Sequence, residues 1–199
     1  MEKQLNLTYD DVLIMEDIEQ RKLYLNTCID ETAITHLAYY ILRYNAMDKD
    51  IPIDKRKPIT LYINSVGGSV SDGWGLIDAI ITSKTPVYTV NLALCASMAF
   101  LVYIAGHKRF SMPHAEFLMH DGMSGVIDST AKARDRMDFE TNQLEVMTKE
   151  FVLKYTKISD DVYEKQYRRE WWFLPEEGQE IGAVDKIIGK DCDIDQIIN

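Results

Sequence analysis

The spacing of apolar residues along the chain predicts alternating strands and helices. Short apolar runs at residues 22–25, 59–63 and 86–92 have the length and β-rich composition of buried strands. Between these runs the apolar residues recur every three or four positions, which predicts a helix after Asp30 and another over residues 72–82. Strands that alternate with helices in this way are typical of an α/β fold with largely parallel pairing.

The C-terminal half continues the pattern and adds one long helix. An apolar helix is expected over residues 97–106, and residues 130–157 show a helical pattern with an apolar stripe and charged other faces. A helix of the second kind usually packs on something outside its own small core. Shorter elements are expected around these two, with strands at 109–111, 115–120 and 183–188 and helices after Ser159 and at 175–182.

Length and composition fit one domain in a reducing compartment. The chain has 199 residues, enough for one substantial domain, which we place at 21–199 behind a polar, weakly periodic arm at 1–20. The net charge of -10 argues against a nucleic-acid partner, because phosphate binding requires clustered Lys and Arg. The three cysteines are odd in number and lack C-x-x-C spacing, which favours a cytoplasmic protein. The longest apolar run, 99–105, is too short for a membrane span of about 20 residues.

Neither a metal nor a cofactor is indicated by the sequence. The histidines and cysteines have no zinc-like spacing, and the acidic residues are spread as on solvated helix faces. The chain has no Gly-Lys-Ser/Thr phosphate loop and no G-x-G-x-x-G turn. We therefore expect chemistry that depends on the chain's own side chains.

Ser97 is the strongest candidate nucleophile. A serine hydrolase needs a hydroxyl at an exposed turn, a histidine within hydrogen-bond reach, an acid that orients the histidine and two backbone donors. Ser97 follows the strand at 86–92 and begins an apolar helix whose N-terminus favours developing negative charge. Local sequence alone favours a simpler role for this serine, that of a helix N-cap.

Two other features could complete such a site. The Gly67-Gly68 pair follows a buried-type strand, where backbone without side chains can approach a substrate and point an N–H at its carbonyl. Taken alone, a Gly-Gly pair is more often a plain turn. His120 ends a strand, a place that holds catalytic groups rigidly, although a histidine there is an ordinary surface residue about as often. The remaining histidines are expected to be structural or exposed: His36, His107 and His114.

Four segments, in order, resemble the Clp protease proteolytic-subunit (ClpP) family. Residues 61–70 (LYINSVGGSV) are similar to that family's strand and glycine turn, and residues 95–98 (CASM) resemble its nucleophile motif. Residues 117–120 (FLMH) are similar to its Met-Ile-His segment, and residues 177–185 resemble its closing motif. The similarity covers about residues 22–189 with few length changes, so it is far more specific than any single motif.

The resemblance implies a fold and a set of site residues. The fold would be a ClpP/crotonase-like α/β spiral of β-β-α units with a protruding handle within residues 121–157. Ser97 would be the nucleophile and His120 the general base, and the backbone N–H groups of Gly68 and Met98 would form the oxyanion hole. Extended substrate would pair with main chain at Gly67, Met123, Ser124, Gly125 and Val126.

The resemblance also implies partners. Members of this family are peptidase subunits that assemble as a homo-oligomeric chamber, a double heptameric ring or tetradecamer. An AAA+ unfoldase hexamer would supply the ATP-dependent step, since this chain has no Walker motif of its own. Unfolded polypeptides or peptides would be the substrates, and no nucleic acid or membrane partner is expected.

The third member of the triad is where the chain departs from the family. The ungapped match to the family's triad aspartate is Glu170, within residues 167–172. Glutamate serves as the third member in other serine hydrolases, but its extra methylene requires a shifted backbone or rotamer. Asp121 and Glu116 are alternative acids, although their closeness in sequence to His120 puts their side chains on unfavourable sides of a strand.

Two other functions stay open at this stage. The glutamate at position 170 motivates a catalytically inactive or weakly active ring subunit with an assembly or regulatory role. A crotonase-like acyl-CoA enzyme would share the fold and the paired backbone donors. It would leave the pairing of Ser97 with His120 unexplained, and it would require a basic patch for CoA that the sequence does not show.

Overall fold

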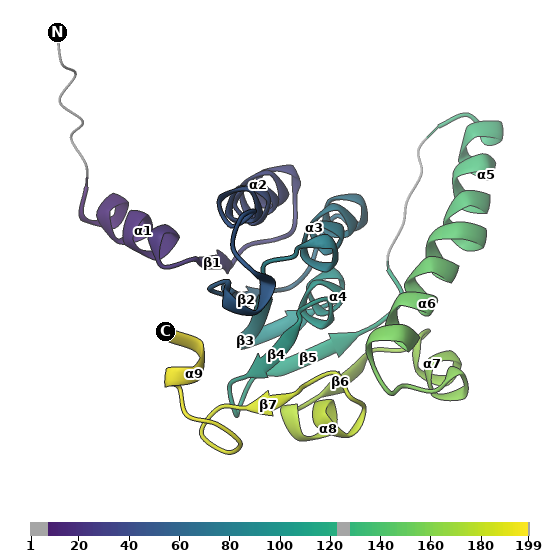
Figure 1. Cartoon of the computed structure of the whole chain (residues 1–199). Coiled ribbons are helices and arrows are strands. Elements are labelled where there is room, and N and C mark those ends of the chain that lie inside the picture. Colours follow the sequence, from purple (N-terminus) through teal and green to yellow (C-terminus); the bar gives the residue numbers. More distant parts are fainter. Residues whose placement is uncertain (1–7, 123–127, 199) are drawn as a thin grey trace, which may run out of the picture.

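The protein folds around one mostly parallel sheet covered by helices (Figure 1), and the computed structural model describes residues 8–122 and 128–198. The strands are β1 (Lys22–Leu25), β2 (Ile59–Ser65), β3 (Val87–Ala96), β4 (Lys108–Ser111), β5 (Glu116–Met119), β6 (Trp171–Phe173) and β7 (Lys186–Ile187). The helices are α1 (Tyr9–Glu19), α2 (Glu31–Met47), the 3-10 turn η1 (Ile53–Lys55), α3 (Val70–Thr82), α4 (Met98–Ile104), α5 (Thr130–Phe139), the π turn η2 (Glu140–Leu144), α6 (Glu145–Tyr155), α7 (Asp160–Gln166), α8 (Pro175–Glu180) and α9 (Asp195–Ile198).

The sheet is parallel except at one end. Strands β1, β2, β3, β4 and β7 lie side by side in that order, and all of these neighbours pair in parallel. Strand β3 changes partner along its length: residues 88–91 pair with β4, whereas residues 94–96 pair with β5. Strand β6 then pairs with β5 in the antiparallel sense. The α/β fold with largely parallel pairing that the sequence predicts is confirmed.

Alternation along β2 shows how the sheet separates two apolar clusters. Ile59, Leu61 and Ile63 are fully buried in the main core, together with apolar residues of α2, α3 and α4. These three helices lie together on one face of the sheet (Figure 1). Tyr62 belongs instead to a second, smaller cluster that includes Ile197 of α9. Strand β2 therefore contributes side chains to both apolar clusters, one on each face of the sheet.

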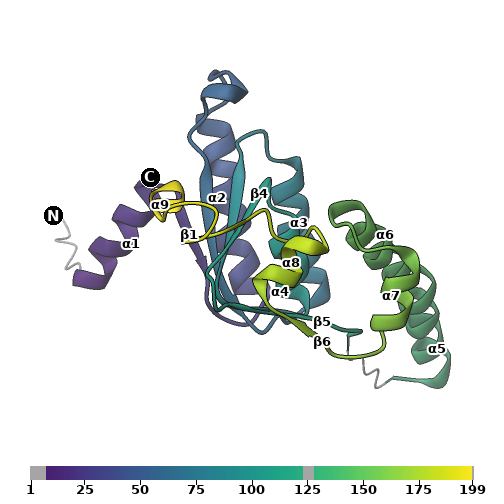
Figure 2. The same ribbon diagram turned by 90° about the horizontal axis from the view of Figure 1, so that it is seen from below.

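Helices α5 and α6 and the π turn between them form one long rod that stands away from the sheet (Figures 1 and 2). The sequence predicts a single helix over 130–157, and the structure confirms a helical segment there but places a π turn in its middle. Among the described residues of this rod, only Phe151 and Val152 are buried. Packing against the domain is thus confined to its C-terminal part.

Four local expectations differ from the structure. Residues of the predicted arm form α1, which is tied to α2 because the Tyr44 hydroxyl donates to the Ile18 carbonyl. Strand β3 extends to Ala96 because its second half gains β5 as a partner. The predicted strand at 183–188 shortens to β7, because the backbone N–H groups of its first two residues donate to the Gly178 carbonyl. Strand β6 was not expected from the sequence.

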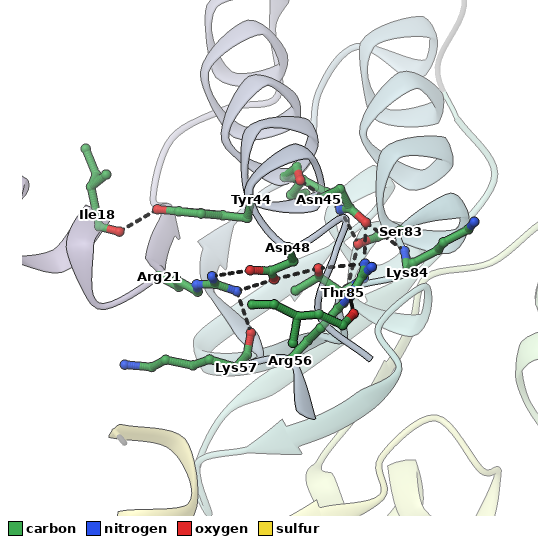
Figure 3. A network of polar contacts seen from close by, with 12 residues as sticks. Ile18, Arg21, Tyr44, Asn45, Asp48, Arg56, Lys57, Ser83, Lys84 and Thr85 are labelled. Carbon is green, nitrogen blue, oxygen red and sulfur yellow. Dashed lines mark hydrogen bonds and ion pairs between the residues drawn. The ribbon is translucent and has the colours of Figure 1, made fainter. Parts of the chain in front are cut away.

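A buried polar network lies where the three neighbouring strands β1, β2 and β3 begin (Figure 3). The Arg21 guanidinium binds both carboxylate oxygens of Asp48 at 2.6 Å and donates to the Lys57 carbonyl. The Thr85 hydroxyl donates to the same carboxylate at 2.9 Å. Arg21, Lys57 and Thr85 lie one or two residues before the three strands, so the network sets their relative start points.

Candidate active site

The parallel strands β2, β3 and β5 end side by side, at the opposite end of the strands from the Asp48 network. In the pairing of β2 with β3, Ser65 is level with Cys95, and in the pairing of β3 with β5, Ala96 is level with Leu118. The residues that follow these strands are the Gly67-Gly68 turn, Ser97 and His120. Parallel pairing therefore brings together three segments that are more than 20 residues apart in sequence.

Ser97 occupies a strained backbone position. It lies between β3 and α4 with φ of 55° and ψ of -126°, and its side chain makes no capping hydrogen bond. Ser69 and Ser159 behave differently, since their hydroxyls accept hydrogen bonds from backbone N–H groups at the starts of α3 and α7. Ser97 thus holds the N-cap position of α4 without acting as an ordinary cap. A positive φ costs a serine about 1 to 2 kcal/mol and is typical of functional turns.

The glycine turn lies directly against Ser97. A Cβ atom on Gly67 would come within 2.7 Å of the Ala96 carbonyl oxygen and 2.9 Å of the Met98 nitrogen. A Cβ on Gly68 would lie 2.3 Å from the Ile29 carbonyl oxygen. Both glycines also have positive φ, 91° and 151°. Glycine at position 67 lets the turn reach the N-terminus of α4, where the Met98 N–H has no partner one turn earlier in the helix, and glycine at position 68 lets it pass Ile29.

His120 faces the same cavity as Ser97. It follows β5, is half-buried, and lines a cavity of about 400 Å³ with Ser97 and Met98. The backbone holds the two segments together, because the Ser97 N–H donates to the Leu118 carbonyl at 2.9 Å. Within residues 8–122 and 128–198, no side-chain hydrogen bond joins Ser97 to His120. The structure brings the predicted nucleophile and base to one cavity without linking them directly.

Glu170 lies opposite His120 in the antiparallel strand register, but its carboxylate binds the Trp172 side chain. The register of β5 with β6 pairs Met119 with Trp171, so Glu170 is the residue opposite His120 at the strand end. The glutamate is exposed and accepts a hydrogen bond of 3.0 Å from the Trp172 indole N–H. The position predicted for the third triad member is therefore adjacent to the histidine, and the side chain is directed toward the tryptophan.

The helices behind the cavity supply residues that the sequence interpretation did not single out. Helix α6 contributes Glu145 and Thr148, and the segment at α7 contributes Tyr163 and Tyr167. Burial raises the pKa of Tyr167 to about 12 and raises that of Tyr163 further, so both phenols are neutral at physiological pH. Glu145 and Thr148 are three residues apart and Tyr163 and Tyr167 are four apart, so each pair lies on one helix face. This spacing is the signal in the sequence that could have grouped them.

Two further observations limit the chemistry of the site. The Cys95 thiol is completely buried, and this burial raises its pKa well above the ordinary value, so it is a poor nucleophile beside Ser97. In the described part of the chain, no group of three or more His, Cys, Asp or Glu residues could hold a metal ion. No helix in the described ranges is long and apolar enough to cross a membrane.

The residues expected to pair with substrate fall into two groups. Gly67 lies beside Ser97 as described above, whereas Met123, Ser124, Gly125 and Val126 lie outside the described residues.

Comparison with known proteins identifies relatives along almost the whole chain. The family model described as Clp protease matches residues 9–191. ATP-dependent Clp protease proteolytic subunit 3 of Streptomyces coelicolor is 30% identical over 191 residues, which cover 94% of this chain and 83% of the relative. Subunit 1 of Streptomyces avermitilis is 31% identical over 185 residues, 90% of this chain and 81% of the relative. Subunit 2 of Mycolicibacterium paratuberculosis is 31% identical over 195 residues, 96% and 92% of the two chains.

Proposed function

Since the chain belongs to the Clp protease family, we propose that it is a serine endopeptidase subunit with Ser97 as its nucleophile. The observation that carries this proposal is the conformation of Ser97, which has a positive φ and no capping hydrogen bond and lines the same cavity as His120. An N-cap serine would have no need of such a conformation. A nucleophile does, because the turn presents its hydroxyl to a substrate.

The proposed mechanism is acyl transfer followed by hydrolysis. His120 takes the proton of the Ser97 hydroxyl as Oγ attacks the peptide carbonyl carbon, and the backbone N–H groups of Gly68 and Met98 bind the resulting oxyanion. His120 then gives the proton to the departing amine, which leaves an acyl-enzyme. A water molecule, activated by the same histidine, releases the acyl group. Each oxyanion donor is worth about 3 kcal/mol in comparable enzymes.

Glu170 is proposed as the acid that orients His120. Its support is the strand register, which puts it opposite the histidine. To act in this way, the Glu170 carboxylate must accept a hydrogen bond from the imidazole, and Oε1 is available for it because the Trp172 indole binds Oε2. The glutamate side chain has the rotational freedom to reach the histidine at its exposed position.

The assembly and the substrates are proposed from the relatives. Their names describe proteolytic subunits of ATP-dependent proteases. We therefore propose a cytoplasmic homo-oligomer, arranged as a double heptameric ring, that works with an AAA+ unfoldase hexamer on unfolded polypeptides. Extended substrate would pair with main chain at Gly67 and at residues 123–126.

Labelling with a fluorophosphonate tests the nucleophile. The assembled protein should react at Ser97, as located by mass spectrometry, and should cleave short fluorogenic peptides. The Ser97→Ala variant should lose both reactions while keeping its assembly state by size-exclusion chromatography. Unlabelled Ser97 in correctly assembled protein would contradict the proposal.

The bond between Glu170 and Trp172 supports a second candidate, a ring subunit without activity of its own. Such a subunit would assemble with an active partner and contribute to structure or docking. The two candidates differ in one measurement, peptide turnover by the pure protein. Turnover that disappears in Ser97→Ala excludes the inactive subunit, whereas assembly without turnover excludes the peptidase.

A further inference from the structure

The lining of the cavity beside Ser97 has an apolar part and a polar part. The apolar part consists of side chains of α4 and α6, including Met98, Leu101 and Val152. One and two turns before Val152 on α6, the lining residues are Thr148 and Glu145, which are polar. A long substrate side chain in this cavity would therefore meet both an apolar wall and polar groups.

One of the polar groups is a buried hydroxyl without a partner. Tyr163 is only 2% exposed and lines the cavity, and within the described residues its hydroxyl has no hydrogen bond. Its ring is fixed by stacking on Tyr167, with ring centroids 5.0 Å apart. Leaving a buried hydroxyl unsatisfied is costly, so such a group marks a place where a ligand can bind.

The second polar group is a carboxylate that is left over after the other charges pair. The Arg136 guanidinium, also in the lining, is bound to Glu140 at 2.8 Å, so these two charges cancel. Glu145 is half-buried, and in the described part of the chain it makes no ion pair or hydrogen bond. Burial is the main reason that the pKa of the Tyr163 phenol is raised, and the carboxylates of Glu164, Glu145 and Asp121 raise it further. Among the described residues that line the cavity, Glu145 is thus a carboxylate without a cationic partner.

We infer that this cavity binds a lysine or arginine side chain of the substrate, at the residue whose carbonyl Ser97 attacks. This inference rests on the proposed peptidase function and adds to it a substrate class. The aliphatic part of the side chain would pack on Met98, Leu101 and Val152. Its cationic end would bind the Glu145 carboxylate and donate a hydrogen bond to the Tyr163 hydroxyl.

An apolar substrate residue fits this cavity less well. It would cover the Glu145 carboxylate and the Tyr163 hydroxyl without offering either a partner, and the desolvation of both groups would oppose binding. An acidic residue would be repelled by Glu145. A long cation alone uses the apolar wall and the polar end together.

Matched active-site probes test this inference. Two peptide diphenyl phosphonates would differ only in the residue bound to phosphorus, lysine in one and norleucine in the other, so that they share a straight chain and differ in the ammonium group. The measurement is the second-order rate of labelling of Ser97 in the assembled protein. We expect the lysine probe to react about tenfold faster, as the loss of one charge-assisted hydrogen bond implies.

Variants of Glu145 and Tyr163 test whether these residues cause the preference for the lysine probe. Glu145→Gln should lower the lysine-to-norleucine ratio about tenfold and Tyr163→Phe about threefold, since the second change removes only a neutral acceptor. Glu150→Gln, the same change at an exposed position of α6, should leave the ratio as in the wild type. A ratio of one or less in the wild type, or a ratio unaffected by Glu145→Gln, would overturn the inference while leaving Ser97 reactive. Failure of a plain fluorophosphonate to label Ser97 would instead refute the proposed function, and with it this inference.

Discussion

At the scale of single residues, the geometry of Ser97 depends on the absence of a side chain at Gly67. The turn after β2 passes within contact distance of the Ala96 carbonyl and the Met98 nitrogen, the two groups on either side of the strained serine. Any Cβ at position 67 must push these groups apart. Strain at Ser97 and glycine at 67 are therefore parts of one arrangement.

Gly67→Ala should destabilise the fold and abolish labelling of Ser97. The alanine would have a positive φ and would overlap backbone atoms, so we expect a loss of at least about 2 kcal/mol in the free energy of unfolding. Gly189→Ala is the matched control, because Gly189 has φ of 81° but no atom near its Cβ position. The control isolates the strain of positive φ, about 1 kcal/mol, and should keep full labelling. Chemical denaturation and fluorophosphonate labelling measure the two effects, and normal labelling of Gly67→Ala would disprove the coupling.

Glu170→Gln tests the third member of the triad. If Glu170 orients His120 and stabilises its charged form, the amide should lower kcat by roughly two to four orders of magnitude with little change in KM. Asp121→Asn serves as the control at the neighbouring acid and should lower kcat much less. Peptide turnover under saturating substrate gives both values. Equal kcat for wild type and Glu170→Gln would remove the glutamate from the mechanism.

At the scale of elements, the sequence predicts best what depends on local periodicity. The runs at 59–63 and 72–82 correspond to β2 and α3, because the apolar spacing there is produced by burial against the sheet. Strand β6 has three residues and exists only because it pairs with β5, about 50 positions earlier, so no local pattern marks it. The cavity residues Glu145 and Tyr163 escaped prediction for a similar reason, since the packing that brings α6 and α7 to Ser97 is not visible in either helix alone.

The short helix α9 closes the second apolar cluster, and one residue should account for most of its contribution. Ile197 is 2% exposed among residues such as Tyr62 and Phe110, and its carbonyl accepts a hydrogen bond of 2.6 Å from the Tyr62 hydroxyl. Ile197→Ala should cost about 2 kcal/mol in the free energy of unfolding, because it leaves a cavity in this cluster. The same change at Ile198, which is 42% exposed, should cost less than about 0.5 kcal/mol. Urea denaturation compares the two, and equal effects would show that α9 does not hold the cluster.

At the scale of the whole molecule, the starts and the ends of the parallel strands have separate roles. The starts of β1, β2 and β3 are held by the network around Asp48, whose residues come from the segments before each strand and from the end of α2 (Figure 3). The ends of β2, β3 and β5 lead into the glycine turn, Ser97 and His120. Rigid strand starts fix the register of the strands, and the register determines how the catalytic segments meet.

Asp48 should make the stability of the whole fold depend on acidity. Its hydrogen bonds from Arg21 lower the pKa of the buried carboxyl below its ordinary value of 3.8, so its contribution is complete at neutral pH and is lost as the pH falls through the lowered folded-state value. Asp48→Asn leaves the guanidinium of Arg21, only 13% exposed, without its counter-charge and should cost about 3 kcal/mol at pH 7. Asp54→Asn, at a pair that is about three-quarters exposed, should change stability by less than about 0.5 kcal/mol.

Measured from pH 7 to pH 2, the gap in unfolding free energy between wild type and Asp48→Asn should narrow below about pH 4, as the wild-type carboxyl becomes protonated. A gap that stays constant across this range would show that the charge of Asp48 does not stabilise the fold.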